Sequence, residues 1–305
     1  MIMFVIFGAT GKVGKATITR LRGEGAPVRA VLRDPAKAAP LAALGCEIAM
    51  AEVGDADAMA LAMRDAAAVQ LICPIDPRAA DASHQMMQSI ERMAEAIDAA
   101  RPPRVLAISD YGAHLTIDTG ITSLFRAMEE RFRQCRARMV FLRSAEHMEN
   151  CARYLKIANE TGVMPSMHQP LERPFPTVSA ADIGDMAANL LLVDGDHGPL
   201  PRIIHGEGPR EYTALEIAAA LGRLLTRSVV ARELPRADWP ATLMRAGLSE
   251  SYTDLIVRLG DVHNKGLIEA EAGVGEIRRG RTELSAAIEP FRPDVRQAVS
   301  IVSIT

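Results

Sequence analysis

The sequence predicts an α/β protein with a Rossmann-type, doubly wound parallel sheet and a smaller, mainly helical C-terminal lobe. Short apolar runs alternate with amphipathic segments through the first half of the chain. A glycine-rich turn follows the first of these runs, and the alternation changes after Arg143. Buried strands separated by helices are typical of a parallel sheet covered on both faces, and right-handed crossovers leave few ways to connect it.

Six short, largely apolar runs in the first half predict buried strands. They are Met3–Phe7, Val28–Leu32, Glu47–Met50, Val69–Cys73, Val105–Ser109 and Val140–Arg143. The clearest helix is Asp81–Ala100, where large apolar side chains recur every three or four residues and share one face. Together these elements predict a first domain over residues 1–150.

The second half has a different pattern. Residues 151–178 contain four prolines and predict an irregular segment. Thr213 and Glu216 have the spacing of a capping box, which predicts the start of a helix. Helices are expected at Ala180–Leu192, Thr213–Leu225, Arg236–Ala246 and Glu250–Leu259, and a strand at Ile203–Ile204. We expect residues 151–305 to form the smaller lobe, with residues 177–205 returning to the first domain.

Composition excludes several functions. The 305 residues include 35 Lys and Arg against 38 Asp and Glu, and this net charge of -3 argues against a nucleic-acid-binding protein. Aromatic residues make up only 4%, too few for a platform that stacks single-stranded bases. No apolar run approaches the ~18 residues of a membrane-spanning helix, so no membrane association is expected.

The four cysteines and seven histidines are scattered along the chain. Cys46, Cys73, Cys135 and Cys151 include no close pair, so neither a disulfide framework nor a zinc site is expected, and a reducing cytoplasm is favoured. The histidines show no metal-ligand spacing, and the sequence therefore predicts no metal site.

The most informative stretch runs from residue 7 to residue 14, as Phe-Gly-Ala-Thr-Gly-Lys-Val-Gly, between the first strand and a helix at about Lys12–Arg22. Glycines let a diphosphate approach main-chain amides, while the helix N-terminus adds unpaired donors and a partial positive charge. The alternative is a tight turn that binds nothing. We expect a dinucleotide, because strand, helix and second strand follow one another at the required spacing. Its expected contacts are Gly8, Thr10, Gly11, Lys12 and Val13.

The end of the second strand discriminates between two dinucleotides. Arg33 stands where an acidic residue would accept hydrogen bonds from the adenosine ribose, and a guanidinium there suits a 2′-phosphate. Lys12 adds charge nearby, and NADP(H) is therefore favoured over NAD(H). In the alternative interpretation Arg33 and Lys37 are only a solvated helix start, and Asp34 faces the ribose.

Further cofactor contacts are expected where the third and fourth strands end, since ligands lie outside the carboxyl ends of parallel strands. Glu52 and Val53 follow the third strand, and Cys73 and Pro74 close the fourth. These residues should flank the adenine and the nicotinamide-side ribose. We expect Cys73 to be a small buried neighbour rather than a nucleophile, because no base is placed beside it.

Six segments stand out by their order and spacing: Gly8–Gly14, Val31–Ala38, Ile108–Ala113, Phe141–Ser144, Met148–Asn150 and Val178–Gly184. They resemble the NmrA-like family of atypical short-chain dehydrogenases/reductases, and the resemblance runs to about residue 292. It implies a Rossmann-type domain, a small C-terminal substrate lobe and NADP(H) binding. Some members of that family are NAD(P)H-dependent reductases of quinones, azo dyes or triphenylmethane dyes. Others are redox sensors that regulate a protein partner without turnover.

The sequence departs from the family near the expected nicotinamide. Tyr111 has no lysine four residues later, so the Tyr-x-x-x-Lys pair of ordinary short-chain reductases is absent. Phe125 replaces the lysine that many members carry four residues before the glutamate matching Glu129. We interpret Glu129 most simply as part of a solvated helix face. The usually aromatic segment before Met148 is polar and contains Glu146.

Two residues are expected to be catalytic. Tyr111 lies with Ser109 at the end of the fifth strand, beside the expected nicotinamide, so Ser109 should contact the cofactor and Tyr111 should act as an acid. Otherwise Tyr111 packs with its hydroxyl in water. His147, with Glu146 beside it, is the second candidate acid, unless the pair only lines the rim of the pocket. His114 is expected in a solvent-exposed loop.

Three functions fit these features. The first is an NAD(P)H-dependent oxidoreductase that transfers hydride from NADPH to a small electrophilic acceptor such as a quinone or dye, which asks little of the protein beyond orientation and a proton source. The second is a non-catalytic NADP(H)-binding redox sensor with a protein partner, which the missing lysine favours. The third is an isomerase or epimerase-like enzyme, which needs an acid/base pair that the chain lacks. A homodimer is compatible with the sequence.

Overall fold

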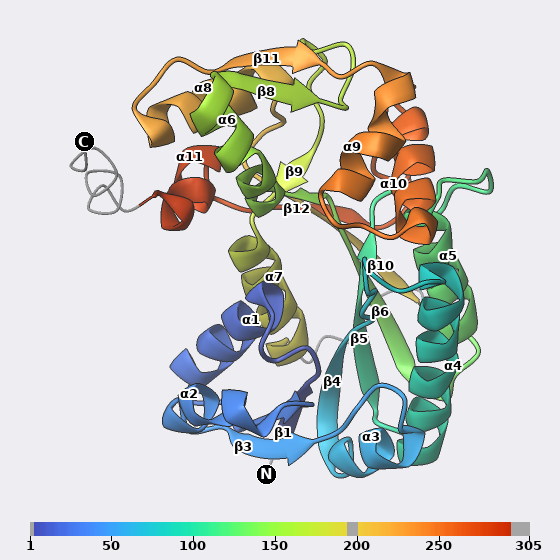
Figure 1. Ribbon diagram of the computed structural model, residues 1–305. Coiled ribbons are helices and arrows are strands. Elements are labelled where there is room, and N and C mark those ends of the chain that lie inside the picture. Colours follow the sequence, from blue (N-terminus) through green and yellow to red (C-terminus); the bar gives the residue numbers. More distant parts are fainter. Residues whose placement is uncertain (1–2, 194–200, 294–305) are drawn as a thin grey trace.

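The computed structural model describes residues 3–193 and 201–293. Its centre is an eight-stranded sheet in the order β12-β10-β6-β5-β4-β1-β2-β3, in which all neighbouring strands are parallel (Figure 1). In chain order the strands are β1 Met3–Ile6, β2 Val28–Leu32, β3 Glu47–Met50, β4 Ala66–Ile72, β5 Arg104–Asp110, β6 Arg138–Ser144, β10 Arg202–Glu207 and β12 Glu276–Arg279. The predicted Rossmann-type α/β fold is confirmed.

Helices cover both faces of this sheet, as the continuous apolar strands require. One layer holds α1 (Lys12–Gly23), α2 (Ala38–Ala43) and α7 (Ala180–Leu192), and the other holds α3 (Ala56–Ala62), α4 (Ala82–Ala100) and α5 (Ile121–Phe132) (Figure 1). Successive residues of β1 face opposite layers: Phe4 and Ile6 pack with α1 and α7, whereas Val5 packs with α3 and α4.

The strand order reverses at β1, which pairs with β2 on one side and β4 on the other. Ligands of open α/β sheets bind in the crevice outside the carboxyl ends of the strands at such a reversal. The residues that follow β1 and β4 therefore flank the expected binding crevice. Helix α1 is held there by close packing on α7, since a Cβ at Gly184 would lie only 2.4 Å from Ala16 Cβ.

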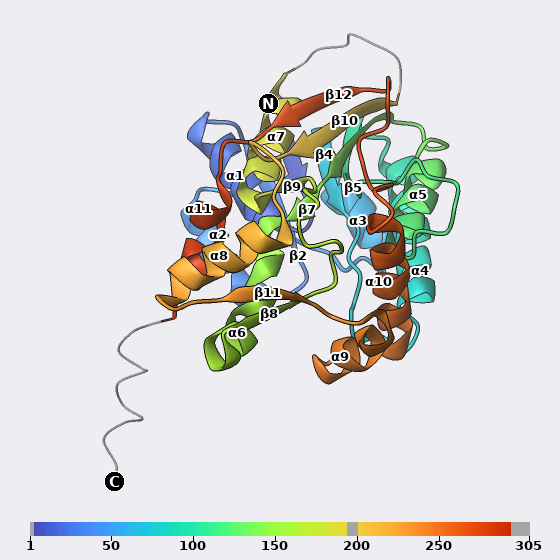
Figure 2. The same cartoon turned by 90° about the horizontal axis from the view of Figure 1, so that it is seen from above.

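The C-terminal lobe lies above the carboxyl ends of the strands in Figure 1 and has an apolar core of its own. Its elements are a 3-10 segment Met148–Tyr154, α6 Leu155–Thr161, β8 Val163–Ser166, α8 Ala214–Leu225, β11 Val230–Glu233, α9 Trp239–Arg245, α10 Glu250–His263 and α11 Leu284–Ile288. β8 pairs with β11, and β7 (Glu146–His147) pairs with β9 (Thr177–Val178) between the lobe and the sheet (Figure 2).

Most predicted elements are confirmed. β2, β3 and α7 have the predicted bounds, and the capping box between Thr213 and Glu216 is present at the start of α8. The prediction of an irregular segment over residues 151–178 is wrong, because it contains α6, β8 and β9. Pro165 fits in β8 because that strand belongs to a two-stranded sheet, where a missing main-chain donor costs little.

β12 has no counterpart among the predicted strands. It is a short, charged edge strand, Glu276–Arg279, that pairs with β10 and brings the chain back to the large sheet after α10. Charged side chains are common on edge strands, where they also weaken the apolar signal on which strand prediction depends. Within the described part of the chain, no helix has the length and hydropathy that crossing a bilayer requires.

Candidate active site

The turn between β1 and α1 is shaped so that only glycine fits at two of its positions. Gly8 has a φ of 70°, in the left-handed region, and its carbonyl accepts a hydrogen bond from the Gly11 amide at 2.9 Å. A Cβ at Gly14 would lie 2.2 Å from the Gly8 oxygen, closer than any real Cβ contact. The first turn of α1 therefore sits directly against the main chain that precedes it.

The N-terminus of α1 is open to an anion. Gly11 is the N-cap and provides no side-chain cap, and the first turn contains no acidic residue. Gly11 and Lys12 are exposed and Thr10 is half-buried, whereas the Val13 side chain is buried in the core and leaves only its main chain available. Uncapped amides and the helix dipole favour a phosphate at this position, so the predicted residues fit a dinucleotide diphosphate.

The end of β2 presents a free cation. Arg33 is exposed, and within residues 3–193 and 201–293 its guanidinium has no recorded hydrogen bond or ion pair. The Asp34 carboxylate is engaged locally, because it accepts a hydrogen bond from the Ala36 amide at 3.0 Å and lies 3.9 Å from Lys37 Nζ. Asp34 caps the 3-10 turn Pro35–Lys37, and this arrangement leaves Arg33 as the group that faces solvent at the strand end.

The residues after β3 and β4 differ in exposure. Glu52 and Pro74 are exposed, while Val53 is half-buried against the core layer of α3 and α4. Cys73 is buried beside Pro74, and burial raises the pKa of its thiol to about 12. A thiol with this pKa stays protonated and is a poor nucleophile, which agrees with the expected role of Cys73 as a small buried neighbour.

Ser109, at the end of β5, belongs to a buried ionic network. Its hydroxyl donates to Glu129 Oε1 at 2.7 Å, and Arg143 Nε and Nη2 donate to the two oxygens of the same carboxylate at 2.8 and 2.7 Å. Arg143 also donates to Glu271 at 2.6 Å. The interpretation of Glu129 as part of a solvated face is wrong, because its side chain is only 2% exposed. The proton of the Ser109 hydroxyl is therefore committed to Glu129.

Tyr111 is turned away from solvent. Its side chain is 1% exposed, and its hydroxyl donates to Glu207 Oε1 at 2.8 Å. Burial, and then the charge of Glu207, raise the pKa of Tyr111 well above its usual value. The alternative expectation was a packing tyrosine with its hydroxyl in water. Tyr111 is packed, but its hydroxyl is buried and bound to the Glu207 carboxylate, so the expected contact with water is wrong. Glu207 also binds Arg279 of β12 at 2.6 Å, so Tyr111 links β5 to the edge of the sheet.

His147 and Glu146 do not form the expected pair. His147 Nε2 lies 3.1 Å from Ser144 Oγ, and burial together with the charge of Lys12 lowers its pKa to about 4. The Glu146 carboxylate instead lies 3.1 Å from His168 Nε2 and 3.4 Å from Arg153. Adjacent residues of a strand point to opposite sides, which explains why the two side chains have different partners. His147 and Lys12, predicted separately, are near each other.

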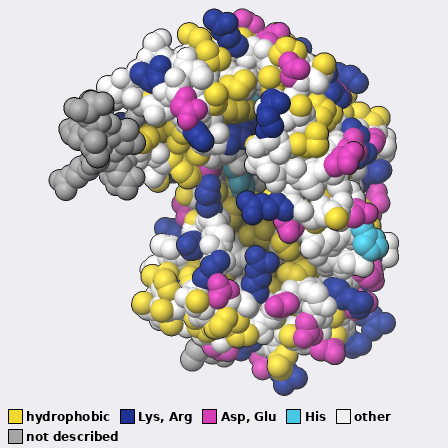
Figure 3. Space-filling model, in the orientation of Figure 1, with side chains coloured by type: hydrophobic (Ala, Val, Ile, Leu, Met, Phe, Trp, Pro, Cys, Tyr) yellow, Lys and Arg dark blue, Asp and Glu magenta, His cyan; other side chains and the backbone are white. Residues whose placement is uncertain are grey.

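A hollow separates the two lobes on the face drawn in Figure 3, and Lys and Arg side chains gather around it. It lies where the sheet strands end and the C-terminal lobe begins, above the N-terminus of α1 (Figure 1). A basic hollow at this position suits a ligand with several phosphates.

Comparisons with known proteins agree with this geometry. A family model described as NAD(P)H-binding matches residues 8–192, which is more than half of the chain and begins at the glycine turn. The chain belongs to this NAD(P)H-binding family. The predicted dinucleotide cofactor is thereby confirmed, and the predicted resemblance to NAD(P)H-dependent reductases is confirmed by the relatives that follow.

Two named relatives are similar over most of their length. Quinone oxidoreductase 2 of Escherichia coli (strain K12) is 26% identical over 259 residues, 83% of this chain and 85% of that protein. NAD(P)H azoreductase of Xenophilus azovorans is 25% identical over 270 residues, 84% of this chain and 86% of that protein. Among solved structures, the triphenylmethane reductase of Citrobacter sp. has a TM-score of 0.78 at 18% identity and covers 95% of this chain and 99% of its own.

This NAD(P)H-binding protein also contains site residues that the sequence analysis missed. Asp110 closes β5, and its carboxylate accepts hydrogen bonds from the Tyr111 amide at 3.0 Å and Thr122 Oγ1 at 2.8 Å. Burial raises the pKa of Asp110 to about 7 despite these bonds. The sequence contained a signal for Asp110, because it directly follows Ser109 at the carboxyl end of a predicted strand, where ligands of parallel sheets bind. His114 is half-buried rather than exposed, and burial lowers its pKa.

Proposed function

We propose that the protein transfers a hydride from NADPH to a small electrophilic acceptor, of the quinone or dye class. The observation that carries this proposal is the uncapped N-terminus of α1 behind the Gly8–Gly14 turn, at the strand reversal of an NAD(P)H-binding sheet. The names of the two relatives, a quinone oxidoreductase and an azoreductase, support the choice of acceptor class.

NADPH rather than NADH is the cofactor we infer. Arg33 is exposed and unpaired within the described residues, at the strand end where the adenosine ribose lies in Rossmann-type sheets. Asp34, the residue that could instead bind the ribose hydroxyls of NADH, has one carboxylate oxygen bound to the Ala36 amide at 3.0 Å and the other 3.9 Å from Lys37 Nζ. A guanidinium fits a 2′-phosphate, and a carboxylate would repel it.

The hollow between the lobes is the site we assign to the acceptor. When bound, NADPH supplies the hydride, and the chain has to orient the acceptor, keep water away and provide a proton.

Tyr111 is badly placed to provide the proton, because its buried hydroxyl is bound to Glu207. His147, with a pKa of about 4, is neutral at pH 7 and suits hydrogen bonding to the acceptor better than acid catalysis. Asp110 is the acid we propose, because it ends β5 at the carboxyl edge of the sheet, its carboxylate is held by the Tyr111 amide and Thr122 Oγ1, and burial raises its pKa to about 7.

The test is turnover and binding measured side by side. Loss of NADPH absorbance should be followed with a panel of quinones and azo dyes, while calorimetry measures the affinity for NADP+ and NAD+. We expect turnover with at least one acceptor class and tighter binding of NADP+. Tight binding of NADP+ without turnover on any acceptor would contradict the reductase and favour the redox sensor.

A further inference from the structure

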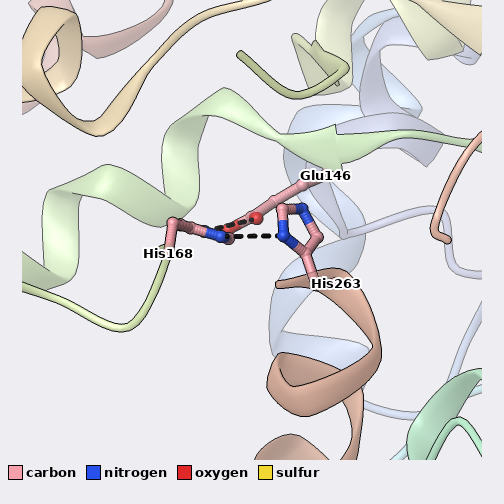
Figure 4. A group of neighbouring side chains, drawn as sticks. All are labelled: Glu146, His168 and His263. Carbon is pink, nitrogen blue, oxygen red and sulfur yellow. Dashed lines mark hydrogen bonds and ion pairs between the residues drawn. The ribbon is translucent and has the colours of Figure 1, made fainter. Parts of the chain in front are cut away.

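We propose that Glu146, His168 and His263 form a binding site for a divalent transition-metal ion, with Zn²⁺ as the ion that this donor set suits best. The three residues come from β7, from the loop after β8 and from the C-terminus of α10, so they show no metal-ligand spacing in the sequence. One ligand atom from each lies within 4.8 Å of the other two (Figure 4). Two imidazoles and one carboxylate are a common zinc donor set.

Two contacts within the cluster are about as long as the distances between neighbouring ligand atoms of a metal centre. His168 Nε2 lies 3.1 Å from Glu146 Oε2, and His168 Nδ1 lies 3.2 Å from His263 Nδ1 (Figure 4). Tetrahedral Zn²⁺ with bonds of about 2.0–2.1 Å places its ligand atoms about 3.3 Å apart. Because the two contacts use different nitrogens of His168, a metal ion requires this ring to move so that one nitrogen is shared. The longest distance between two ligand atoms of the cluster, which is at most 4.8 Å, must also shrink by up to about 1.5 Å.

The surrounding contacts hold the two imidazoles side by side. Asn264, next to His263, donates from Nδ2 to the Met167 carbonyl at 2.8 Å and accepts at Oδ1 from the Gln169 amide at 3.0 Å. These two bonds flank His168 in sequence and tie its loop to the end of α10. The ring of Phe175 stacks on His168 at 4.0 Å. Such an outer layer orients metal ligands and limits their freedom before the metal arrives.

The exposure of the cluster is also compatible with a metal ion. The Glu146 carboxylate uses Oε1 for Arg153 at 3.4 Å, which leaves Oε2 for the cluster. The side chains of Glu146 and His168 are 25% and 18% exposed, so the cluster is reachable from solvent. An ion here would join β7 to two segments of the C-terminal lobe.

The competing explanation is a hydrogen-bonded chain without metal. His168 Nε2 would donate to Glu146, and one proton between His168 Nδ1 and His263 Nδ1 would satisfy the second contact. The proposal does not depend on turnover, so metal binding can be measured whether or not an acceptor is found.

The experiment uses the full chain after treatment with a chelator. Calorimetry with Zn²⁺ should give one site, and Co²⁺ should produce the visible absorption bands of a tetrahedral centre with nitrogen and oxygen ligands. His168→Gln and His263→Gln should each weaken Zn²⁺ binding by at least about tenfold and abolish the Co²⁺ bands. His84→Gln, at an exposed histidine on α4, is the matched control and should bind as the wild type does.

Binding of NADP+ to each variant serves as the test of folding, since none of these histidines lies at the glycine turn or at the end of β2. The absence of a Zn²⁺ site in the wild type would overturn the proposal and favour the hydrogen-bonded chain. Equal Zn²⁺ affinity in wild type and in both cluster variants would overturn it as well, because the ion would then bind elsewhere.

Discussion

Replacement of Arg33 by alanine should change the choice of cofactor more than the ability to bind one. A hydrogen-bonded guanidinium–phosphate pair contributes about 1.5–3 kcal/mol, and the exposure of Arg33 favours the lower part of that range. A loss of about 1.5–2 kcal/mol corresponds to an affinity for NADP+ that is about 10–30-fold weaker. The affinity for NAD+, which lacks the 2′-phosphate, should change by less than about twofold.

Calorimetry with both nucleotides at low and high salt measures this effect, and the loss for NADP+ should shrink at high salt because the contact is exposed. Lys37→Ala is the control, since Lys37 Nζ is paired with Asp34 at 3.9 Å. It should weaken NADP+ binding by no more than about threefold. An equal loss for NADP+ and NAD+ in Arg33→Ala, or no loss for either, would refute the assignment of Arg33 to the 2′-phosphate.

Three further predictions concern the turn and the strand ends. Gly14→Ala should weaken NADP+ binding by more than about tenfold, because its Cβ would lie 2.2 Å from a main-chain oxygen of the turn. Gly23→Ala in the same helix, where nothing lies within 4 Å of the new Cβ, should leave calorimetric binding unchanged. Tyr111→Phe should lower the free energy of unfolding by about 1–3 kcal/mol, because the buried Glu207 carboxylate loses a hydrogen-bond donor. Its steady-state turnover should stay within about twofold of the wild type. A hundredfold fall in turnover would mean that the Tyr111 hydroxyl is the acid. Asp110 has a folded pKa of about 7 against 3.8 in a model peptide, so its contribution to stability is complete below about pH 4 and is lost as the pH rises to about 7. Relative to Asp110→Asn, the wild type should therefore lose up to about 1.4 kcal/mol per pH unit in denaturant titrations across that window, and parallel curves would contradict the raised pKa.

Local sequence signals accounted for the cofactor end of the fold. The glycine turn, the strand that precedes it and the helix that follows it are adjacent in the chain, so their geometry could be predicted from the glycines and the apolar pattern around them. The capping box at Thr213 is equally local, because both of its hydrogen bonds lie within four residues. Such contacts depend on spacing along the chain, which a sequence displays directly.

The acceptor side could not be predicted in the same way, because its contacts join residues that are far apart in the chain. In the sequence, Glu129 has the pattern of a surface residue on a charged helix. In the structure, β5 and β6 place Ser109 and Arg143 against its carboxylate and bury it. Glu146 stands beside His147 in the sequence, yet its imidazole partner is His168, brought in from a loop of the other lobe. Burial and pairing at such sites are set by the packing of the lobes, not by neighbours in sequence.

The central claim is that main-chain amides at the start of α1 hold the diphosphate of NADPH. A crystal structure of the chain with NADP+ tests it most directly. The account predicts that diphosphate oxygens lie within about 2.7–3.2 Å of amide nitrogens of residues 11–13, with the 2′-phosphate at Arg33. A nucleotide bound elsewhere, with the space in front of α1 filled by side chains, would contradict it.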